Sequence, residues 1–209
     1  MSSNQAINLQ NIGIIMLAAG SSQRFQGDKR QAQMENGLSL LENSLAQVPD
    51  TFSKRLLVLH PGDEALAEKF SFSWDIFIAK EAAQGMGNSL SGAIQSIMKS
   101  ATKWQGALIG LGDMPFIQPE TYCSLQKSLI EHEIVTPTKQ GKRGNPVGFR
   151  DRYFEEMSRL KGDQGARLLI KKYQSQCYLH ELSDDGVFRD IDTVEALKAA
   201  TTSTGILTR

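Results

Sequence analysis

One stretch near the N-terminus constrains this chain more than any other: an apolar run that ends in a loop of small residues. The run covers residues 12–17 and has the length and composition of a buried strand. Residues 18–22 that follow, around Gly20, have small side chains, so the backbone can turn sharply and another molecule can approach the main chain. Backbone N–H groups left unpaired in such a loop can point together at an anion.

Two cations follow this loop, Arg24 and Lys29. Their full charges would add to the dipoles of the backbone amides, so the stretch has the physical features of a triphosphate site. The same residue types also suit a strand and a loop with two solvated basic side chains. Neither of the two best-known phosphate loops, G-x-x-x-x-G-K-[ST] and G-x-G-x-x-G, occurs here.

Length and composition narrow the class of protein. The 209 residues fit one sizeable domain, 1–209, with a core at about 12–200 and polar termini. The 23 basic and 23 acidic residues balance, which argues against nucleic acid and anionic membranes as partners. No apolar run approaches the roughly 20 residues of a membrane helix, and the polar start lacks a secretory pattern. Cys123 and Cys177 show neither metal nor disulfide spacing. A cytoplasmic protein with free thiols is expected.

Apolar strands and amphipathic helices alternate along the chain. Strands are expected at 12–17, 56–59, 76–78, 104–111 and 134–135, and near 178–179 and Phe188. Helices are expected at 38–45, 63–70, 90–98, 119–131, 151–159, 163–173 and 193–200, and a loop at 30–36. This alternation predicts a single-domain α/β fold, a mostly parallel twisted sheet with helices on both faces.

A carboxylate follows one of the expected strands. Asp113 lies just beyond the strand 104–111. Ligands of open α/β sheets gather at the carboxyl ends of the strands, where Asp113 and the Gly20 loop would both emerge. A single carboxylate there suits Mg²⁺, which fills its other positions with phosphate oxygens and water. The alternative is an Asp that caps the turn before Pro115.

A second pair of carboxylates, Asp190 and Asp192, lies near the C-terminus. In a strand these two side chains would share one face. Alternatively, Asp192 caps the last helix in a capping box with Glu195.

The segment 84–89 offers another anion site, because a turn at Gly85 exposes a helix N-terminus that suits phosphate or ribose. Without a ligand, the same pattern is a helix start with Ser89 as its N-cap.

Several of these segments resemble motifs of the molybdenum cofactor cytidylyltransferases, small nucleotidyltransferases related to the molybdenum cofactor guanylyltransferases. Residues 17–29 are similar to L-A-A-G-x-S-x-R-M-G-x-x-K, and residues 112–115 match G-D-M-P. Other similar segments are 84–89 (Q-G-x-x-x-S), 143–147 (R-G-H-P-V), 162–167 (G-D-x-G-A-R) and 190–195 (D-I-D-T-P-E). Phe25 replaces the family Met, Gln26 is an extra residue, and Val194 replaces Pro. Asn145 replaces His, which removes a titratable donor and leaves an amide that can hydrogen-bond a pterin or a phosphate.

The resemblance, from about residue 12 to 200, implies a Rossmann-like nucleotidyltransferase fold and assigns roles to residues. It implies that Arg24, Lys29 and Asp113 are catalytic, and that Asp113 and Asp192 hold the metal, with Asp190 as the alternative second ligand. The nucleotide-binding residues that it implies are Leu17, Ala18, Ala19, Gly20, Ser21, Ser22, Arg24, Lys29, Gln84, Gly85 and Ser89. The second-substrate residues that it implies are Arg143, Gly144, Asn145, Pro146 and Arg167.

The implied reaction joins CTP to the phosphate of molybdopterin-bound molybdenum and releases pyrophosphate, with Mg²⁺ as the cofactor and Mn²⁺ as its substitute. The product would pass to a molybdenum hydroxylase. One alternative keeps the chemistry and changes the substrates, to GTP or to another phosphorylated acceptor. Another is a non-catalytic, nucleotide-binding maturation factor for a molybdenum hydroxylase. A NAD-binding oxidoreductase is disfavoured because G-x-G-x-x-G is missing.

Overall fold

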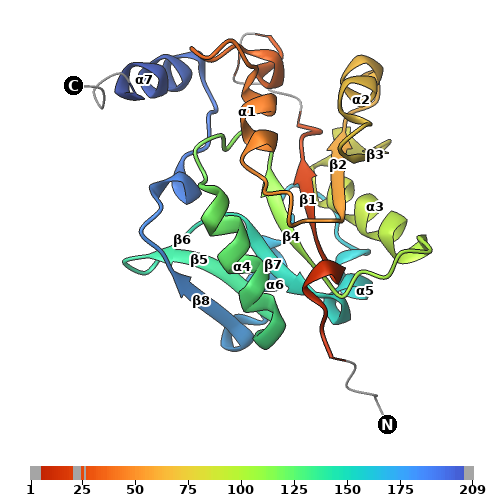
Figure 1. The fold of residues 1–209 in the computed structure, drawn as a ribbon. Coiled ribbons are helices and arrows are strands. Elements are labelled where there is room, and N and C mark those ends of the chain that lie inside the picture. Colours follow the sequence, from red (N-terminus) through yellow and green to blue (C-terminus); the bar gives the residue numbers. More distant parts are fainter. Residues whose placement is uncertain (1–5, 21–24, 26, 205–209) are drawn as a thin grey trace.

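The computed structural model describes residues 6–20, 25 and 27–204, and side chains only as far as residue 199. An eight-stranded sheet runs through the molecule in the order β3-β2-β1-β4-β7-β5-β6, and β8 pairs with β5 (Figure 1). The strands are β1 Ile12–Leu17, β2 Arg55–Leu59, β3 Asp75–Ile78, β4 Gly106–Leu111, β5 Ile134–Lys139, β6 Lys142–Arg143, β7 Val147–Arg150 and β8 Cys177–Glu181.

Most of the sheet is parallel. Strands β3, β2, β1 and β4 pair in parallel, as do β5 and β8. Strand β7 runs antiparallel between β4 and β5, and β6 forms a hairpin with β5. The predicted α/β fold with a mostly parallel sheet is confirmed, and the reversed strand β7 makes the sheet mixed.

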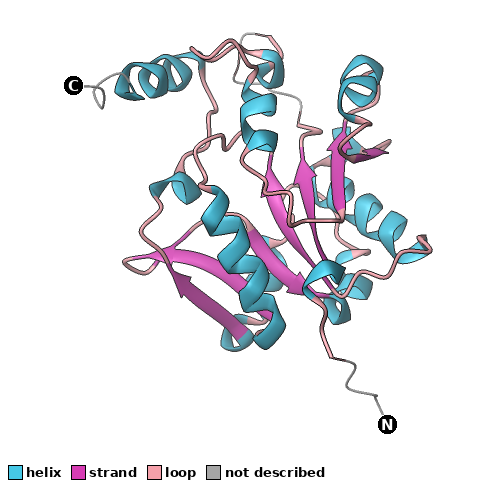
Figure 2. Ribbon diagram, viewed as in Figure 1, coloured by secondary structure: helices cyan, strands magenta, loops and turns pink. Residues whose placement is uncertain are grey.

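Helices cover both faces of this sheet (Figure 2). The α-helices are α1 Leu40–Ala46, α2 Glu64–Phe70, α3 Met86–Lys99, α4 Pro119–Glu131, α5 Phe154–Met157, α6 Arg167–Lys172 and α7 Val194–Thr204. The short 3₁₀ helices are η1 Leu9–Asn11, η2 Lys29–Gln31, η3 Ala82–Gln84, η4 Asp151–Tyr153, η5 Gln174–Gln176 and η6 Asp185–Phe188. None of the helices described is long and apolar enough to cross a membrane.

The core has two layers because successive residues of a strand point to opposite faces. Ile15 of β1 packs in one apolar cluster with α3, α5 and α6, and Ile14 and Met16 pack in the other with α1 and α4. All six residues of β1 are buried, which explains why this strand reads as a continuous apolar run.

Some expectations about local structure are wrong. The strand near Phe188 is the 3₁₀ helix η6. Helix α3 begins at Met86 after Gly85, so Ser89 is a buried residue within the helix and not its N-cap. The loop expected at 30–36 includes part of η2 and an isolated bridge between Gln33 and Ser39. At the start of α7, the hydroxyl of Thr193 accepts a hydrogen bond from the Ala196 N–H at 3.1 Å, so Thr193 takes part in capping this helix.

Candidate active site

The Gly20 loop and Asp113 emerge side by side because β1 and β4 are neighbours in the sheet. Leu17 and Leu111 are partners at the ends of these strands, and the Gly112 N–H donates to the Leu17 carbonyl at 3.0 Å. A Cβ at Gly112 would lie 2.9 Å from Leu41 and 3.0 Å from Ala18, so the absence of a side chain lets the two loops approach closely. The edge of the sheet therefore presents both segments to a common ligand.

A compact cluster of charges lies at this edge. The Lys29 Nζ donates to Asp113 Oδ2 at 2.6 Å and to Asp192 Oδ1 at 2.9 Å. The three side chains come from η2, from the end of β4 and from the segment before α7. The Ile191 N–H donates to the Asp113 carbonyl at 3.0 Å and joins the last two segments. Lys29 and Asp113 are 15% and 20% exposed, whereas Asp192 is 43% exposed and marks the open side of the cluster.

The electrostatics of the cluster favour an additional positive charge. Burial raises the pKa of Asp113; Lys29 opposes this shift, and Asp192 and Asp190 add to it. Burial alone would lower the pKa of Lys29, but the carboxylates of Asp113 and Asp192 raise it above its ordinary value. The Asp113 shift thus comes mainly from burial, and the Lys29 shift comes from the two carboxylates; both shifts favour the more positively charged state of the cluster.

The two carboxylates fit a divalent metal ion. Asp113 Oδ1 is buried and has no hydrogen-bond partner among the described atoms. Asp113 and Asp192 already share one cation, the Lys29 ammonium group, so both can reach a common point. Hard cations such as Mg²⁺ take oxygen ligands and need only one or two protein carboxylates when phosphate and water complete the shell. The described residues contain no group of three or more His, Cys, Asp or Glu side chains that could hold a metal ion. A magnesium site that is completed by phosphate and water does not require such a group.

The backbone around the Gly20 loop is only partly described. Leu17, Ala18 and Ala19 are buried, and Gly20 is exposed. The Ala18 N–H is used by the Val58 carbonyl at 2.9 Å, so this amide is committed to the sheet. Ser21, Ser22 and Arg24 lie outside the described residues.

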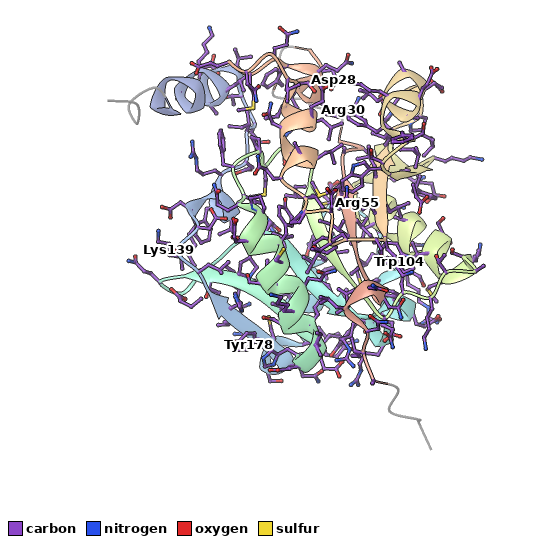
Figure 3. The ribbon with its side chains drawn as sticks, viewed as in Figure 1. Asp28, Arg30, Arg55, Trp104, Lys139 and Tyr178 are labelled. Atoms are coloured by element: carbon purple, nitrogen blue, oxygen red, sulfur yellow. The ribbon has the colours of Figure 1, made fainter. Side chains whose placement is uncertain are left out.

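Arg30 is a well-anchored residue near this site that sequence reasoning missed. Its guanidinium lies between the carboxylates of Asp28 and Asp63 and donates to the Ala18 carbonyl at 2.9 Å. The opposite charges of Asp28 and Arg30 point to a local ion pair, but Asp63 lies 33 residues from Arg30 in the sequence, so this second contact could not be foreseen. Figure 3 labels Asp28 and Arg30 next to each other above the sheet.

The segment 84–89 is joined to the segment 161–163 at the start of α3. The Gly87 N–H donates to the Gly162 carbonyl at 2.6 Å, and the Asn88 side chain accepts from the Gly162 N–H at 2.8 Å. Gln84 is exposed beside Asn88, with its side-chain oxygen 3.2 Å from Asn88 Nδ2. Two of the motifs thus form one structural unit. Arg167, the first residue of α6, is exposed.

The turn at 143–146 packs against η6. The Asn145 N–H donates to the Val187 carbonyl at 3.0 Å, and the Gly144 N–H donates to the Pro137 carbonyl at 2.8 Å. A Cβ at Gly144 would lie 2.5 Å from the Val187 carbonyl, so only glycine fits here. Arg143 is exposed on β6, and Pro146 is buried directly before β7. Val187 and Asp192 belong to the same stretch of backbone. The expected second-substrate segment therefore contacts the stretch that carries Asp192 of the charge cluster.

Comparison with known protein families gives the class of protein. A family model described as "MobA-like NTP transferase domain" matches residues 14–177. With the fold and the carboxylate cluster described above, this match makes the chain a nucleotidyltransferase. It belongs to the MobA-like NTP transferase family, and the resemblance to molybdenum cofactor nucleotidyltransferases is confirmed at the level of the family.

Individual relatives agree with this assignment. The chain is 27% identical over 191 residues to the purine catabolism protein PucB of Bacillus subtilis, covering 87% of this chain and 91% of that protein. The crystal structure of Rv0371c from Mycobacterium tuberculosis superimposes with a TM-score of 0.75 at 23% identity, over 91% of this chain and 98% of that one. A second structure of Rv0371c is a complex with manganese, with a TM-score of 0.71 at 22% identity, over 92% and 98% of the two chains. Molybdopterin-guanine dinucleotide biosynthesis protein A from Archaeoglobus fulgidus superimposes with a TM-score of 0.66 at 16% identity, over 93% and 99% of the two chains. At these identities the superpositions establish the fold.

Proposed function

We propose that the protein transfers a cytidylyl group from CTP to the phosphate of molybdopterin-bound molybdenum and releases pyrophosphate. The observation that carries the proposal is the cluster of Lys29, Asp113 and Asp192 beside the Gly20 loop, with Nζ–Oδ distances of 2.6 and 2.9 Å. It offers both a cation and a metal-binding carboxylate pair where phosphates would enter.

The reaction needs no covalent intermediate with the protein and no base to activate the nucleophile, because the attacking group is already an ionised phosphate. The protein must align the acceptor with the α-phosphate and neutralise the charge that develops on the leaving pyrophosphate. In our proposal the Gly20 loop and Arg24 hold the triphosphate, and Lys29 turns from the carboxylates to the phosphates. We also assign Gln84, Gly85 and Ser89 to the nucleotide, as the resemblance implies; Gln84 is exposed there, whereas Ser89 is buried within α3. The residues 143–146 with Arg167 are proposed to receive the acceptor.

Asp113 and Asp192 would hold Mg²⁺, or Mn²⁺ in its place. When bound, the metal would act as a Lewis acid on the phosphate oxygens and as a template for the triphosphate. Asp192 is supported over Asp190 as the second ligand because it shares Lys29 with Asp113. The manganese complex of Rv0371c, a protein of the same fold, supports a divalent ion in this proposal.

The choice of base rests on the resemblance to the cytidylyl branch. Selectivity would come from backbone groups after Leu17 and near Lys80 and Glu81 that hydrogen-bond the edge of the correct base and would be left unpaired with the wrong base. GTP is the alternative, since the Archaeoglobus fulgidus neighbour is named for a guanine dinucleotide. We further propose that a molybdenum hydroxylase receives the product. We also propose that the protein acts in the cytoplasm and that residues 1–209 form one domain.

The test is a screen of the four nucleoside triphosphates for pyrophosphate release, each with and without molybdenum cofactor, in the presence of Mg²⁺. We expect release with CTP that depends on the cofactor. Equal or greater turnover with GTP would overturn the choice of base and leave the transferase class standing. Tight nucleotide binding without pyrophosphate under any condition would favour a non-catalytic maturation factor instead.

A further inference from the structure

All five N–H donors of the Arg30 guanidinium form hydrogen bonds within the protein. Its Nε and one terminal nitrogen each donate to Asp28 at 2.8 Å, and the same terminal nitrogen donates to Asp63 at 2.8 Å. The other terminal nitrogen donates to Asp63 and to the Ala18 carbonyl. Every N–H group of a guanidinium is then in use, so Arg30 has none left for a phosphate. Its side chain is only 12% exposed and Asp63 is 11% exposed, so water competes poorly for these bonds.

These bonds connect three segments of the candidate site. Ala18 belongs to the loop after β1, and Asp63 belongs to the segment after β2, where its carboxylate also accepts the His60 N–H at 2.7 Å. Asp28 caps η2 by accepting the Arg30 N–H at 3.0 Å. Lys29 lies between Asp28 and Arg30 in the chain, so the anchoring of both neighbours determines where its side chain starts.

We propose that Arg30 is a positioning residue that acts through Lys29: by fastening η2 to Ala18 and Asp63, it holds the Lys29 amine over Asp113 and Asp192. This inference rests on the role proposed above for Lys29. Arg30 is not a ligand of the substrate, because its donors and both flanking carboxylates are already committed to one another. Lysine at this position would keep the charge but could not bridge two carboxylates and a carbonyl in this planar geometry.

Arg55 provides a matched control. Its guanidinium is similarly enclosed, 16% exposed, and it also fastens a loop, donating to the carbonyls of Phe52 and Pro49 at 2.9 Å. Arg55 is the first residue of β2, whereas Asp63, the partner of Arg30, follows the end of that strand. The guanidiniums of Arg55 and Arg30 therefore lie at opposite ends of β2 (Figure 3). Loss of Arg55 should lower stability without moving Lys29.

The first measurement is the rate at which an amine-reactive reagent labels Lys29, followed by mass spectrometry of the whole chain. In the wild type we expect slow labelling of Lys29 and fast labelling of Lys171, which is exposed in the last turn of α6. Arg30→Gln should bring the Lys29 rate toward that of Lys171, whereas Arg55→Gln should leave it unchanged. An unchanged Lys29 rate in Arg30→Gln overturns the proposal. If Arg30→Gln does not fold, Arg30→Lys and Asp63→Asn are measured in its place, with the same expectation.

The second measurement is a double-mutant cycle on turnover. Arg30→Gln should lower kcat by about ten- to a hundredfold, the cost of a misplaced catalytic group. In the Lys29→Ala background the same change should cost less than about twofold, because the group that Arg30 positions is already gone. Equal losses in both backgrounds overturn the proposal. If the wild type turns over no nucleotide, the proposed function fails, and the labelling of Lys29 alone decides the role of Arg30.

Discussion

At the scale of single residues, the two carboxylate oxygens of Asp113 have different surroundings, and both point to a role in the site. One oxygen accepts from Lys29 at 2.6 Å, and the other is buried without a partner among the described atoms. Buried polar atoms are costly unless something uses them, so this oxygen is best explained by a ligand that binds during function. The same geometry leads to two predictions.

Asp113→Ala should abolish pyrophosphate release and leave the fold intact, because the missing group acts on charge in the transition state. Pyrophosphate assays in Mg²⁺ and thermal unfolding would check both parts. Asp185→Ala is the control, since Asp185 is 68% exposed and pairs with Lys139 away from the cluster. A near-normal rate for Asp113→Ala in Mg²⁺ would contradict the role given to this carboxylate.

Lys29→Ala should lower kcat/KM by about ten- to a hundredfold, since a charge-assisted hydrogen bond contributes roughly 1.5–3 kcal/mol. Binding of Mn²⁺ alone should become tighter, because the ammonium group at 2.6 and 2.9 Å from the carboxylates no longer competes for them. Steady-state kinetics and titration with Mn²⁺ would measure the two effects. If the variant instead loses stability while each folded molecule keeps its activity, Lys29 is structural.

At the scale of elements, the ends of helices depend on contacts that local sequence does not contain. The apolar stripe from residue 90 predicted the body of α3 but not its first turn. That turn begins after Gly85, whose φ of 116° is not helical, and it packs on the segment 161–163. Strands β1 and β4 were located well, since a strand buried on both faces is apolar throughout. The short strand expected at Phe188 failed because a brief apolar run has no period to identify it.

Gly85→Ala and Gly20→Ala compare a glycine that the surrounding backbone requires with one that has room for a methyl group. A Cβ at Gly85 would lie 2.4 Å from Asp163 Oδ1 and 2.5 Å from the Gly162 backbone, so this change should cost about 1–3 kcal/mol of stability. A Cβ at Gly20 meets no described atom within 4 Å, so Gly20→Ala should leave stability unchanged and weaken nucleotide binding. Denaturant unfolding and nucleotide titration would compare the two variants. Equal stability losses would contradict this division.

Glu42 ties α1 to α2 and should make stability depend on pH. It accepts from the Ser39 N–H at 2.9 Å in a capping box and pairs with Lys69 at 2.8 Å. The hydrogen bond from Lys69, helped by Ser39, lowers the pKa of Glu42 to about 2. A carboxyl group with a lowered folded pKa stabilises above its unfolded pKa and loses that contribution as the pH falls through the folded value.

Glu42→Gln should therefore remove about 1 kcal/mol at neutral pH, a figure reduced for the exposure of Lys69 to solvent. The difference from the wild type should vanish as the pH falls from about 4.5 to about 2. Urea unfolding at several pH values would measure it. A stability difference that stays constant over this range would contradict the assigned cause.

At the scale of the whole molecule, the fold class followed from the alternation of strands and helices, but the order of strands did not. Strand β7 runs backwards between β4 and β5 through long-range pairing, and no local pattern marks that reversal. The motifs brought Lys29, Asp113 and Asp192 into one hypothesis, and the structure places them within hydrogen-bonding distance. The bond between Arg30 and Asp63 stayed hidden because it forms only when the loops after β1 and β2 meet.

Binding of metal and nucleotide together should stabilise the whole domain. A ligand that binds only the folded state at a hundred times its Kd adds about 2.7 kcal/mol, which raises the Tm of a chain of this size by about 5–10 °C. We expect this shift with CTP and Mg²⁺ together, and a much smaller one with CTP and a chelator, because Asp113 and Asp192 need a cation between them and the phosphates. Asp113→Ala should show no shift with either mixture, although its own Tm stays near that of the wild type. Thermal unfolding with each of the four nucleotides would measure the shifts. A shift of the same size in Asp113→Ala would show that the nucleotide binds without the carboxylate cluster, and the proposed site would then be wrong.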